Sequence, residues 1–322
     1  FDAVDGVHGN EGWVSDGTSA GTFLIKDLCP GSGDGYFQNP IVYKNAVYYN
    51  GYSPTTGSGV YKTTGVAGDP TLAMNMSWSY IPAIINDTLY FAAYANPTAN
   101  YQYNYELHCT DFSSLQPTLV KDIRPGSTNY PNLFFMTAID NHVYFEADDG
   151  IHGQEVWISG GHLYDTQLLK DINPGSGGGA YTSFFRKANG KAYFIGQDAA
   201  AGREIWESDG TASGTVVYDI LPGTSGANPF NCRDYNDELY LRASDGITGT
   251  ELWKIGSGVI GIEEFENSTD GMKIYPNPVV GIVTVESQKK GTITVCDILG
   301  NRVWAQTIEQ SKNDINLRNL SS

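Results

Sequence analysis

One phrase recurs along this chain and determines how its fold has to be interpreted. EGWVSDGTSAGTFLIKDLCPGS begins at Glu11, EVWISGGHLYDTQLLKDINPGS at Glu155 and EIWESDGTASGTVVYDILPGTS at Glu204, with a shortened copy, ELWKIGSG, at Glu251. An apolar pair before a Gly/Asp loop precedes each copy, and alignment on this pair gives six units that start 42 to 54 residues apart. These starts are Phe1, Tyr49, Phe91, Phe145, Phe194 and Leu241. A period of this length is typical of the blades of a β-propeller.

Each unit predicts four short antiparallel strands, because apolar and polar residues alternate in runs separated by turn residues. In the fifth unit Asn189-Gly190 gives the strongest hairpin signal, since both residues tolerate positive φ. The strands predicted there are Thr182–Lys187, Ala192–Gly196, Glu204–Ser208 and Thr215–Ile220. The sequence therefore predicts an all-β fold, with a propeller of about six four-stranded blades over residues 1–266. Since the first unit starts at its second strand, we expect the natural protein to begin upstream of Phe1.

Composition excludes several classes of partner. The 322 residues carry a net charge of −17, which disfavours binding to nucleic acid or to an anionic membrane. No stretch approaches the roughly 20 apolar residues that span a bilayer, so we expect no membrane insertion. The four cysteines share no CxxC spacing, and we predict neither a metal site nor a cofactor. A disulfide between Cys29 and Cys232 is left open, because a closed ring would make their units neighbours.

Two resemblances follow from these motifs. The string E-x-W-x-S-D-G-T-x-x-G-T followed by K-D-I-x-P-G resembles the ELWxxDGT repeats of secreted Bacteroidetes proteins, whose blades are similar to those of TolB-type propellers. After an expected linker at residues 267–272, KIYPNPVVGIVTVES, GTITVCDILGNRVW and DINLRNLSS resemble the C-terminal sorting domain of type IX secretion substrates. This resemblance implies a partial immunoglobulin-like β-sandwich over residues 273–322. It also implies export by the type IX secretion machinery and a secreted or cell-surface location.

That sorting domain is expected to be incomplete. The family continues past the position of Leu320 into a further strand and a basic tail, whereas this sequence stops at Ser322. The pattern of the segment is nevertheless that of strands, because Ile282–Val285 and Ile293–Val295 alternate as half-buried strands do.

Recurring polar and aromatic residues have structural explanations. The aspartates of the D-x-x-x-G-x-E loops could hold calcium, but one loop offers too few ligands, so we expect Asp149 and its equivalents to cap the turn and the glutamate to open the third strand. His8 and His152 share one position in this loop and are expected to be exposed turn residues. The tryptophans Trp13, Trp157, Trp206 and Trp253 recur at one point of the third strand, which predicts packing between blades.

The third unit departs most from the repeat and supplies the binding hypothesis. Its loop between the second and third strands is enlarged to YANPTANYQYNYE, which brings Tyr94, Tyr101, Tyr103 and Tyr105 among polar residues. In a propeller this loop emerges on the same face as the Gly-rich loops between blades, so a binding surface is predicted there. First strands line the central channel, which adds Arg186 and Arg233 as candidates for an anionic ligand.

The leading functional hypothesis is adhesion or binding, with carbohydrate or protein recognised through the loop face. No catalytic motif stands out, and no catalytic residue is predicted. Two alternatives stay open. One is a propeller hydrolase acting on polysaccharide or peptide, which would need paired carboxylates at the channel mouth. The other is a structural spacer within a larger adhesin.

Overall fold

The computed structural model describes residues 1–94, 105–125, 131–181, 184–256, 273–275, 282–286, 290–296, 302–308 and 312–316. The chain divides into two compact units, Phe1–Trp253 and Lys254–Ser322, and each is described by itself. Within the described residues the one helical element is a short 3-10 turn, η1, at Leu163–Asp165. The all-β prediction is therefore confirmed. No helix of this part of the chain is long and apolar enough to cross a bilayer.

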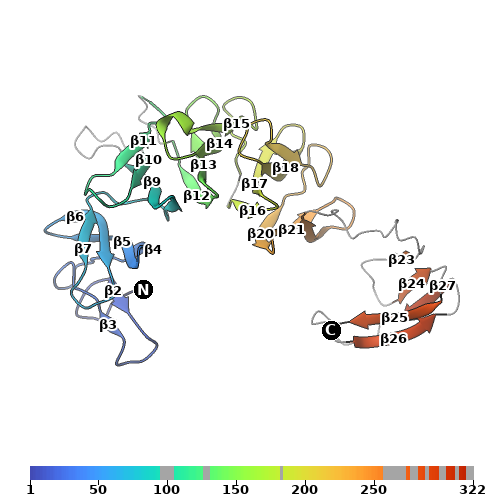
Figure 1. Cartoon of the computed structure of the whole chain (residues 1–322), viewed down its shortest axis with the longest axis horizontal. Coiled ribbons are helices and arrows are strands. Elements are labelled where there is room, and N and C mark those ends of the chain that lie inside the picture. Colours follow the sequence, from blue (N-terminus) through green and yellow to red (C-terminus); the bar gives the residue numbers. More distant parts are fainter. Residues whose placement is uncertain are drawn as a thin grey trace. The chain divides into compact units, whose positions relative to one another are not determined.

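The first unit consists of six antiparallel sheets in sequence order (Figure 1), and each sheet pairs strands that follow one another along the chain. The first three sheets contain β1 (Asp2–Ala3), β2 (Glu11–Val14) and β3 (Phe23–Leu24); β4 (Gln38–Tyr43), β5 (Ala46–Ser53), β6 (Gly57–Thr63) and β7 (Thr71–Met74); and β8 (Ala83–Ile85), β9 (Thr88–Tyr94), β10 (Tyr105–Thr110) and β11 (Thr118–Lys121). The last three contain β12 (Phe134–Ile139), β13 (His142–Asp148), β14 (Gln154–Ser159) and β15 (Gln167–Lys170); β16 (Arg186–Ala188), β17 (Lys191–Asp198), β18 (Gly202–Ser208) and β19 (Val216–Tyr218); and β20 (Phe230–Tyr235), β21 (Glu238–Ser244) and β22 (Thr250–Ile255).

These sheets are the propeller blades that the repeat predicts. The aligned apolar pairs lie on β5, β9, β13, β17 and β21, the second strand of their blades, and the carbonyl of Phe1 accepts the backbone N–H of Trp13 at 2.8 Å beside β1. Four blades have four strands, whereas the first and sixth have three among the described residues. Strand β16 begins at Arg186, later than the predicted Thr182, and residues 182–183 lie outside the described part.

Apolar side chains of neighbouring blades form shared cores. Trp157 of the fourth blade is 5% exposed and packs in one cluster with residues of the third blade such as Leu107. Trp206 of the fifth blade is 4% exposed and packs with residues of the fourth, including Tyr144. The prediction that these tryptophans pack between blades is confirmed for both.

For Trp253 the same prediction was wrong, because this ring is only partly buried, as is Trp13 on β2. Trp253 lies on β22, the outermost described strand of the sixth blade, where no fourth strand covers it, and its neighbour Leu252 is 73% exposed. Its indole N–H donates to the carbonyl of Ala243 at 3.0 Å. The recurrence of the motif therefore predicts the position of the ring but not its burial.

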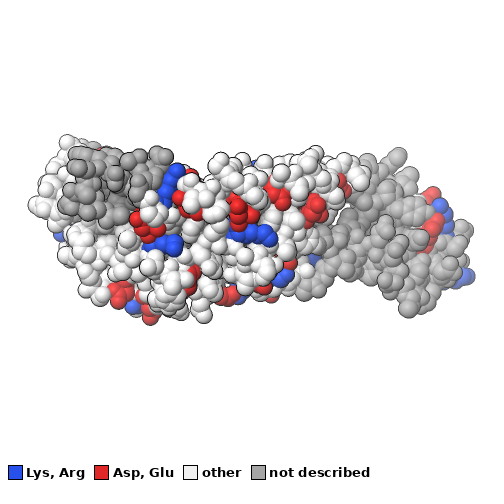
Figure 2. Space-filling model, turned by 90° about the horizontal axis from the view of Figure 1, so that it is seen from above, with Lys and Arg blue, Asp and Glu red and all other residues white. Residues whose placement is uncertain are grey.

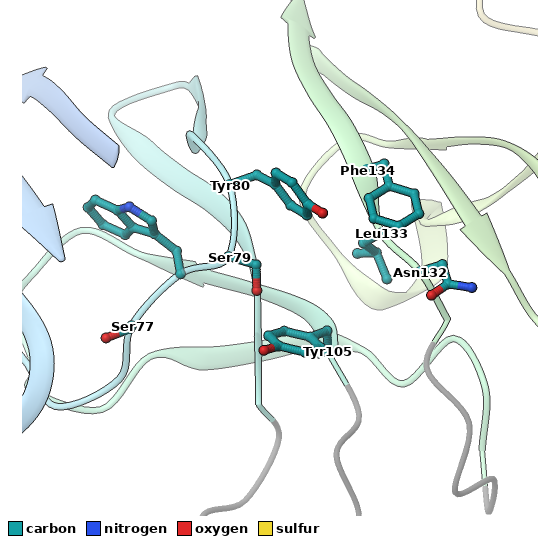
Figure 3. Close-up of a pocket in the computed structure, with 8 residues that line it drawn as sticks. Ser77, Ser79, Tyr80, Tyr105, Asn132, Leu133 and Phe134 are labelled. Atoms are coloured by element: carbon teal, nitrogen blue, oxygen red, sulfur yellow. The ribbon is translucent and has the colours of Figure 1, made fainter. Parts of the chain in front are cut away.

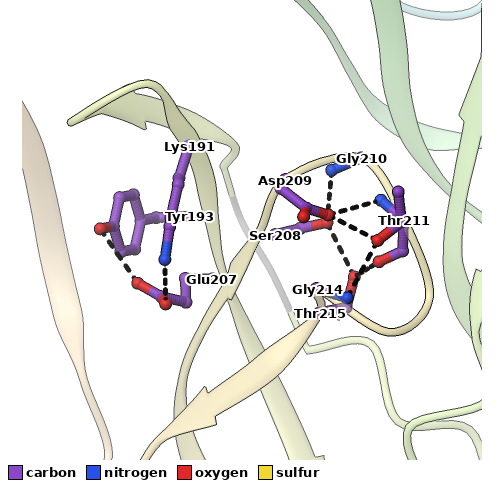
Figure 4. A network of polar contacts seen from close by, with 9 residues as sticks. All are labelled: Lys191, Tyr193, Glu207, Ser208, Asp209, Gly210, Thr211, Gly214 and Thr215. Carbon is purple, nitrogen blue, oxygen red and sulfur yellow. Dashed lines mark hydrogen bonds and ion pairs between the residues drawn. The ribbon is translucent and has the colours of Figure 1, made fainter.

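The conserved geometry of the S-D-G-T turn comes from a closed set of hydrogen bonds (Figure 4). Asp209 Oδ1 accepts the backbone N–H and the hydroxyl of Thr211, at 2.9 and 2.7 Å, and the hydroxyls of Ser208 and Thr215 lie 2.7 Å apart. Gly214 is required because a Cβ there would overlap the Asp209 carboxylate. The turn thus fixes the hairpin between the third and fourth strands.

The fourth blade forms the same hairpin, but its carboxylate comes from the residue at the other side of the turn. Gly160 stands where the fifth blade has Asp209, and Asp165 stands where it has Gly214. Asp165 Oδ1 accepts the backbone N–H of His162 at 2.7 Å, and Ser159 and Thr166 keep their hydroxyl contact at 2.7 Å. The second blade also uses this arrangement, with Asp69 accepting from Thr63 and from the backbone N–H of Thr64.

The aspartates between the second and third strands cap their turns, as predicted. Asp149 Oδ1 accepts the backbone N–H groups of Ile151 and His152 at 2.8 and 2.9 Å, and its other oxygen lies 2.7 Å from the His152 ring. Asp5 makes the same contacts with the backbone of Val7 and His8. These carboxylates are therefore engaged in hydrogen bonds within their own loops.

The second unit contains two small sheets. One pairs β23 (Lys273–Tyr275), β24 (Ile282–Glu286) and β27 (Lys312–Asn316), and the other pairs β25 (Gly291–Cys296) with β26 (Arg302–Ile308). Val285 and Ile315 of the first sheet are 1% exposed and share a core with Ile293 and Trp304 of the second. Two sheets packed through a common core form a β-sandwich, which is the fold that the resemblance to the sorting domain implies.

Candidate functional site

A buried glutamate anchors the loop that joins one blade to the next. Glu155, on β14, accepts the backbone N–H of Ile172 at 3.2 Å and that of Asn173 at 3.3 Å, one on each carboxylate oxygen. The sequence predicted this glutamate only as the first residue of the strand. The same contact to the loop after the fourth strand is made by Glu11, Glu106 and Glu204. In each case the buried carboxylate anchors the backbone of the loop.

Burial also changes the acidity of these carboxyl groups. Loss of solvent raises the pKa of Glu106 and of Glu155 to about 7, even though backbone N–H groups oppose the shift. The pKa values of Glu11 and Glu204 are raised for the same reason. Glu251, on the edge strand β22, is exposed.

One of these loops, the connection from β11 to β12 that Glu106 anchors, helps to form a pocket of about 440 Å³ at the third blade (Figure 3). Three segments contribute: the loop between β7 and β8, the start of β10, and the residues that lead into β12. The first and third of these are connections between blades, and the second follows the connection between the second and third strands. They meet at one end of the blade, because alternate connections of an antiparallel sheet lie at the same end. The residues that line the pocket are Ser77, Trp78, Ser79, Tyr80, Tyr105, Asn132, Leu133 and Phe134.

The pocket combines aromatic walls with uncharged polar groups. The rings of Tyr80 and Phe134 meet edge to face, with centroids 5.5 Å apart, and Tyr80 is 46% exposed. Ser79 Oγ is buried and has no hydrogen-bond partner among the described residues. Figure 3 shows Ser79 between the rings of Tyr80 and Tyr105, with Asn132 beyond Leu133.

Neighbouring contacts hold these groups in place. Trp78 is 2% exposed; its indole N–H donates to the carbonyl of Asn39 at 3.2 Å, and Asn50 bonds its backbone on both sides. The carbonyl of Asn132 accepts the side-chain amide of Gln154 at 2.9 Å. Asn132 has a φ of 49°, a left-handed conformation that asparagine tolerates better than most residues. The walls of the pocket are therefore built on a supported backbone.

The tyrosines proposed from the sequence are only partly placed here. Tyr105 lines the pocket and pairs across the ladder with Tyr94, the last residue of β9. Tyr101 and Tyr103 lie outside the described residues. Tyr80 and Ser79 were missed because the second unit has lost the repeat motif that marks its loops, and Asn132 and Phe134 were missed because they lie just beyond the Gly-rich loop that the sequence indicated. The sequence W-S-Y at residues 78–80, directly after the fourth strand, was the available signal.

The two arginines proposed for the channel are not part of this pocket. Arg186 lies on β16, where its Nε is 3.3 Å from Asp234 and its guanidinium carbon 5.3 Å from the centroid of the Phe184 ring. Arg233 lies on β20 and donates to the carbonyl of Cys232 at 2.8 Å. On the face seen in Figure 2, basic and acidic side chains are interspersed and no large basic patch is visible. The thiols of Cys29 and Cys232 are both free.

Comparison with known proteins indicates where this protein resides. Residues 273–322 match the family model described as the secretion system C-terminal sorting domain. The protein is secreted or held at the cell surface. This tail is the part of the chain that the type IX secretion machinery recognises. No curated protein sequence matches the chain.

Solved structures similar to this chain are distant and larger. A prolyl endopeptidase is 11% identical, with a TM-score of 0.49, over 98% of this chain and 48% of that one. Prolyl oligopeptidase B from Galerina marginata is 9% identical, with a TM-score of 0.49, over 98% and 49%. TolB from Acinetobacter baumannii is 11% identical, with a TM-score of 0.38, over 74% and 60%. The chain thus spans about half to three fifths of the length of these three proteins.

Proposed function

We propose that this protein is an ELWxxDGT-repeat propeller of the Bacteroidetes type, exported by type IX secretion, that binds an extracellular carbohydrate or protein through its loop face. The observation that carries the proposal is the pocket between Tyr80, Tyr105 and Phe134. Aromatic rings, tyrosine above all, supply much of the binding energy at many recognition sites. The pocket volume of about 440 Å³ lies within the range of ligand sites.

Binding explains the pocket better than hydrolysis does. A glycosidase needs two carboxyl groups on either side of the scissile bond. None of the eight lining residues in the described part of the chain is acidic. The carboxylates nearest in sequence are used structurally, since Glu106 accepts the backbone N–H of Ile123 at 2.6 Å.

Removing both wall rings should abolish most binding. We expect the double variant Tyr80→Ala/Phe134→Ala to lower binding to the producing organism's surface, or to its ligand, by tenfold or more, because truncating aromatic anchors commonly costs over 1.4 kcal/mol. The Tm should fall only modestly, since Tyr80 is 46% exposed and Phe134 is only partly buried. The measurement is whole-cell binding of the purified protein.

The matched control is Tyr164→Ala. Tyr164 is 82% exposed on the hairpin between β14 and β15, at the other end of its blade. It should leave binding unchanged. Equal losses in the control and the double variant would remove the pocket from the proposal and leave the spacer hypothesis.

Deleting residues 273–322 tests the export half of the proposal. We expect the shortened protein to accumulate in the periplasm of the producing organism, folded, because the sorting domain is a unit separate from the propeller. Fractionation and limited proteolysis measure both properties. Normal secretion of the deletion variant would contradict the role given to this domain.

A further inference from the structure

We infer that the pocket at the third blade binds an uncharged glycan. This inference rests on the proposed function and names the chemistry of the ligand. Three features of the pocket carry it: the absence of charge on its lining, the arrangement of its rings, and a buried hydroxyl that has no partner among the described residues.

Charge excludes most other ligands. Each of the eight lining residues that the structure describes is neutral, so these residues offer no counter-ion for a phosphate, a carboxylate, a sulfate or an amine. The whole chain carries a net charge of −17, which repels acidic polysaccharides such as uronate polymers. A charged peptide motif would also enter without a partner and lose its hydration.

The rings fit the two kinds of surface that a sugar presents. A pyranose has an apolar C–H face and a rim of hydroxyl groups, so it stacks on an aromatic ring while its rim bonds to neighbouring polar groups. Tyr80 and Phe134 stand edge to face, 5.5 Å apart between centroids. They therefore offer two differently oriented apolar walls, and Tyr105 offers a third (Figure 3).

The hydroxyl of Ser79 identifies the polar contact. A buried hydroxyl without a hydrogen bond costs free energy, and it regains that loss when a ligand supplies a partner. Ser79 Oγ is in this state among the described residues, whereas the Ser79 carbonyl already accepts the side-chain amide of Asn39 at 3.3 Å. A sugar hydroxyl can donate to Oγ and accept from it once the Ser79 side chain turns toward the pocket, because Oγ has almost no exposed surface in this structure. The side-chain amide of Asn132 supplies a second polar group to the same volume.

The experiment uses the full chain and an immobilised panel of neutral polymers (glucans, mannans, xylans and galactans) beside acidic polygalacturonate and alginate, at physiological salt. We expect at least one neutral polymer to bind and the acidic ones not to bind. Tyr80→Ala should lower that affinity tenfold or more, and Tyr164→Ala should not change it. Failure to bind any neutral polymer, or preference for an acidic one, would overturn the inference.

Ser79→Ala provides a signature that general damage to the fold would not produce. We expect a three- to tenfold loss of affinity together with an unchanged or raised Tm, because the folded protein loses a buried hydroxyl that it does not satisfy. An unchanged affinity for the bound neutral polymer would overturn the role of Ser79 and of the pocket. Whole-cell binding separates the two proposals. If pocket variants lose binding to a surface protein while no neutral glycan binds, the proposed function stands and the glycan does not.

Discussion

Replacing Trp206 by alanine should lower the free energy of unfolding by about 3–5 kcal/mol. The indole is 4% exposed and fills the space between the fourth and fifth blades, packed with residues such as Val156 and Leu169. Its loss leaves a cavity that two sheets cannot both collapse to fill. Urea unfolding followed by far-UV circular dichroism measures the change.

Trp253→Ala is the matched control, since the same motif places this ring on the edge strand β22, where it is only partly buried. We expect this variant to lower the free energy of unfolding by about 1 kcal/mol or less, because a half-exposed ring buries little apolar area. Equal costs at the two positions would contradict the assignment of Trp206 to the contact between blades.

Stability should fall as the pH rises from about 4.5 to above 7, and Glu155 should account for part of the fall. Burial raises the pKa of its carboxyl from 4.5 to about 7, so the folded state keeps a proton that the unfolded state has released in this range. The unfolded state therefore binds fewer protons, and the free energy of unfolding decreases with pH. Each pKa unit corresponds to 1.36 kcal/mol, which gives a limit of about 3 kcal/mol for this group.

Comparison with Glu155→Gln isolates this effect from the repulsion among the other acidic groups. The amide cannot titrate, so the variant should lose less stability than the parent between pH 5 and pH 8. At pH 5 it should already be less stable by about 1–3 kcal/mol, because its NH2 group faces a backbone N–H of Ile172 or Asn173. Identical pH profiles for the two proteins would show that Glu155 does not titrate in this window.

The repeat predicted the architecture because each blade is specified locally. Alternation and turn residues place β17 and β18 within a few residues of the predicted strands, and Asn189-Gly190 forms the predicted hairpin with φ values of 52° and 68°. What the motif could not predict depends on neighbours. The burial of a repeated tryptophan depends on the strand beside it, which is why Trp206 and Trp253 differ.

The candidate site was harder to predict for the same reason. Its residues come from two connections between blades and one strand, and none of them belongs to the repeated phrase. Tyr105 was found because an unusual loop precedes it, whereas Ser79 and Asn132 come to line the same pocket only when the third blade is assembled. The anchoring role of Glu155 was missed because its partners are backbone N–H groups, which leave no trace in the sequence.

The two forms of the hairpin between the third and fourth strands show what the recurring phrase actually conserves. In the fifth blade Asp209 supplies the carboxylate, and Gly214 has no side chain that would overlap it. In the fourth blade Asp165 supplies the carboxylate, and Gly160 has no side chain that would overlap it. What recurs is thus a carboxylate that accepts hydrogen bonds from the turn, and either side of the turn can supply it. A blade in which the carboxylate comes from the other side of the turn lacks the letters D-G-T but forms the same hairpin. The letters D-G-T alone would therefore not identify the fourth blade of this chain.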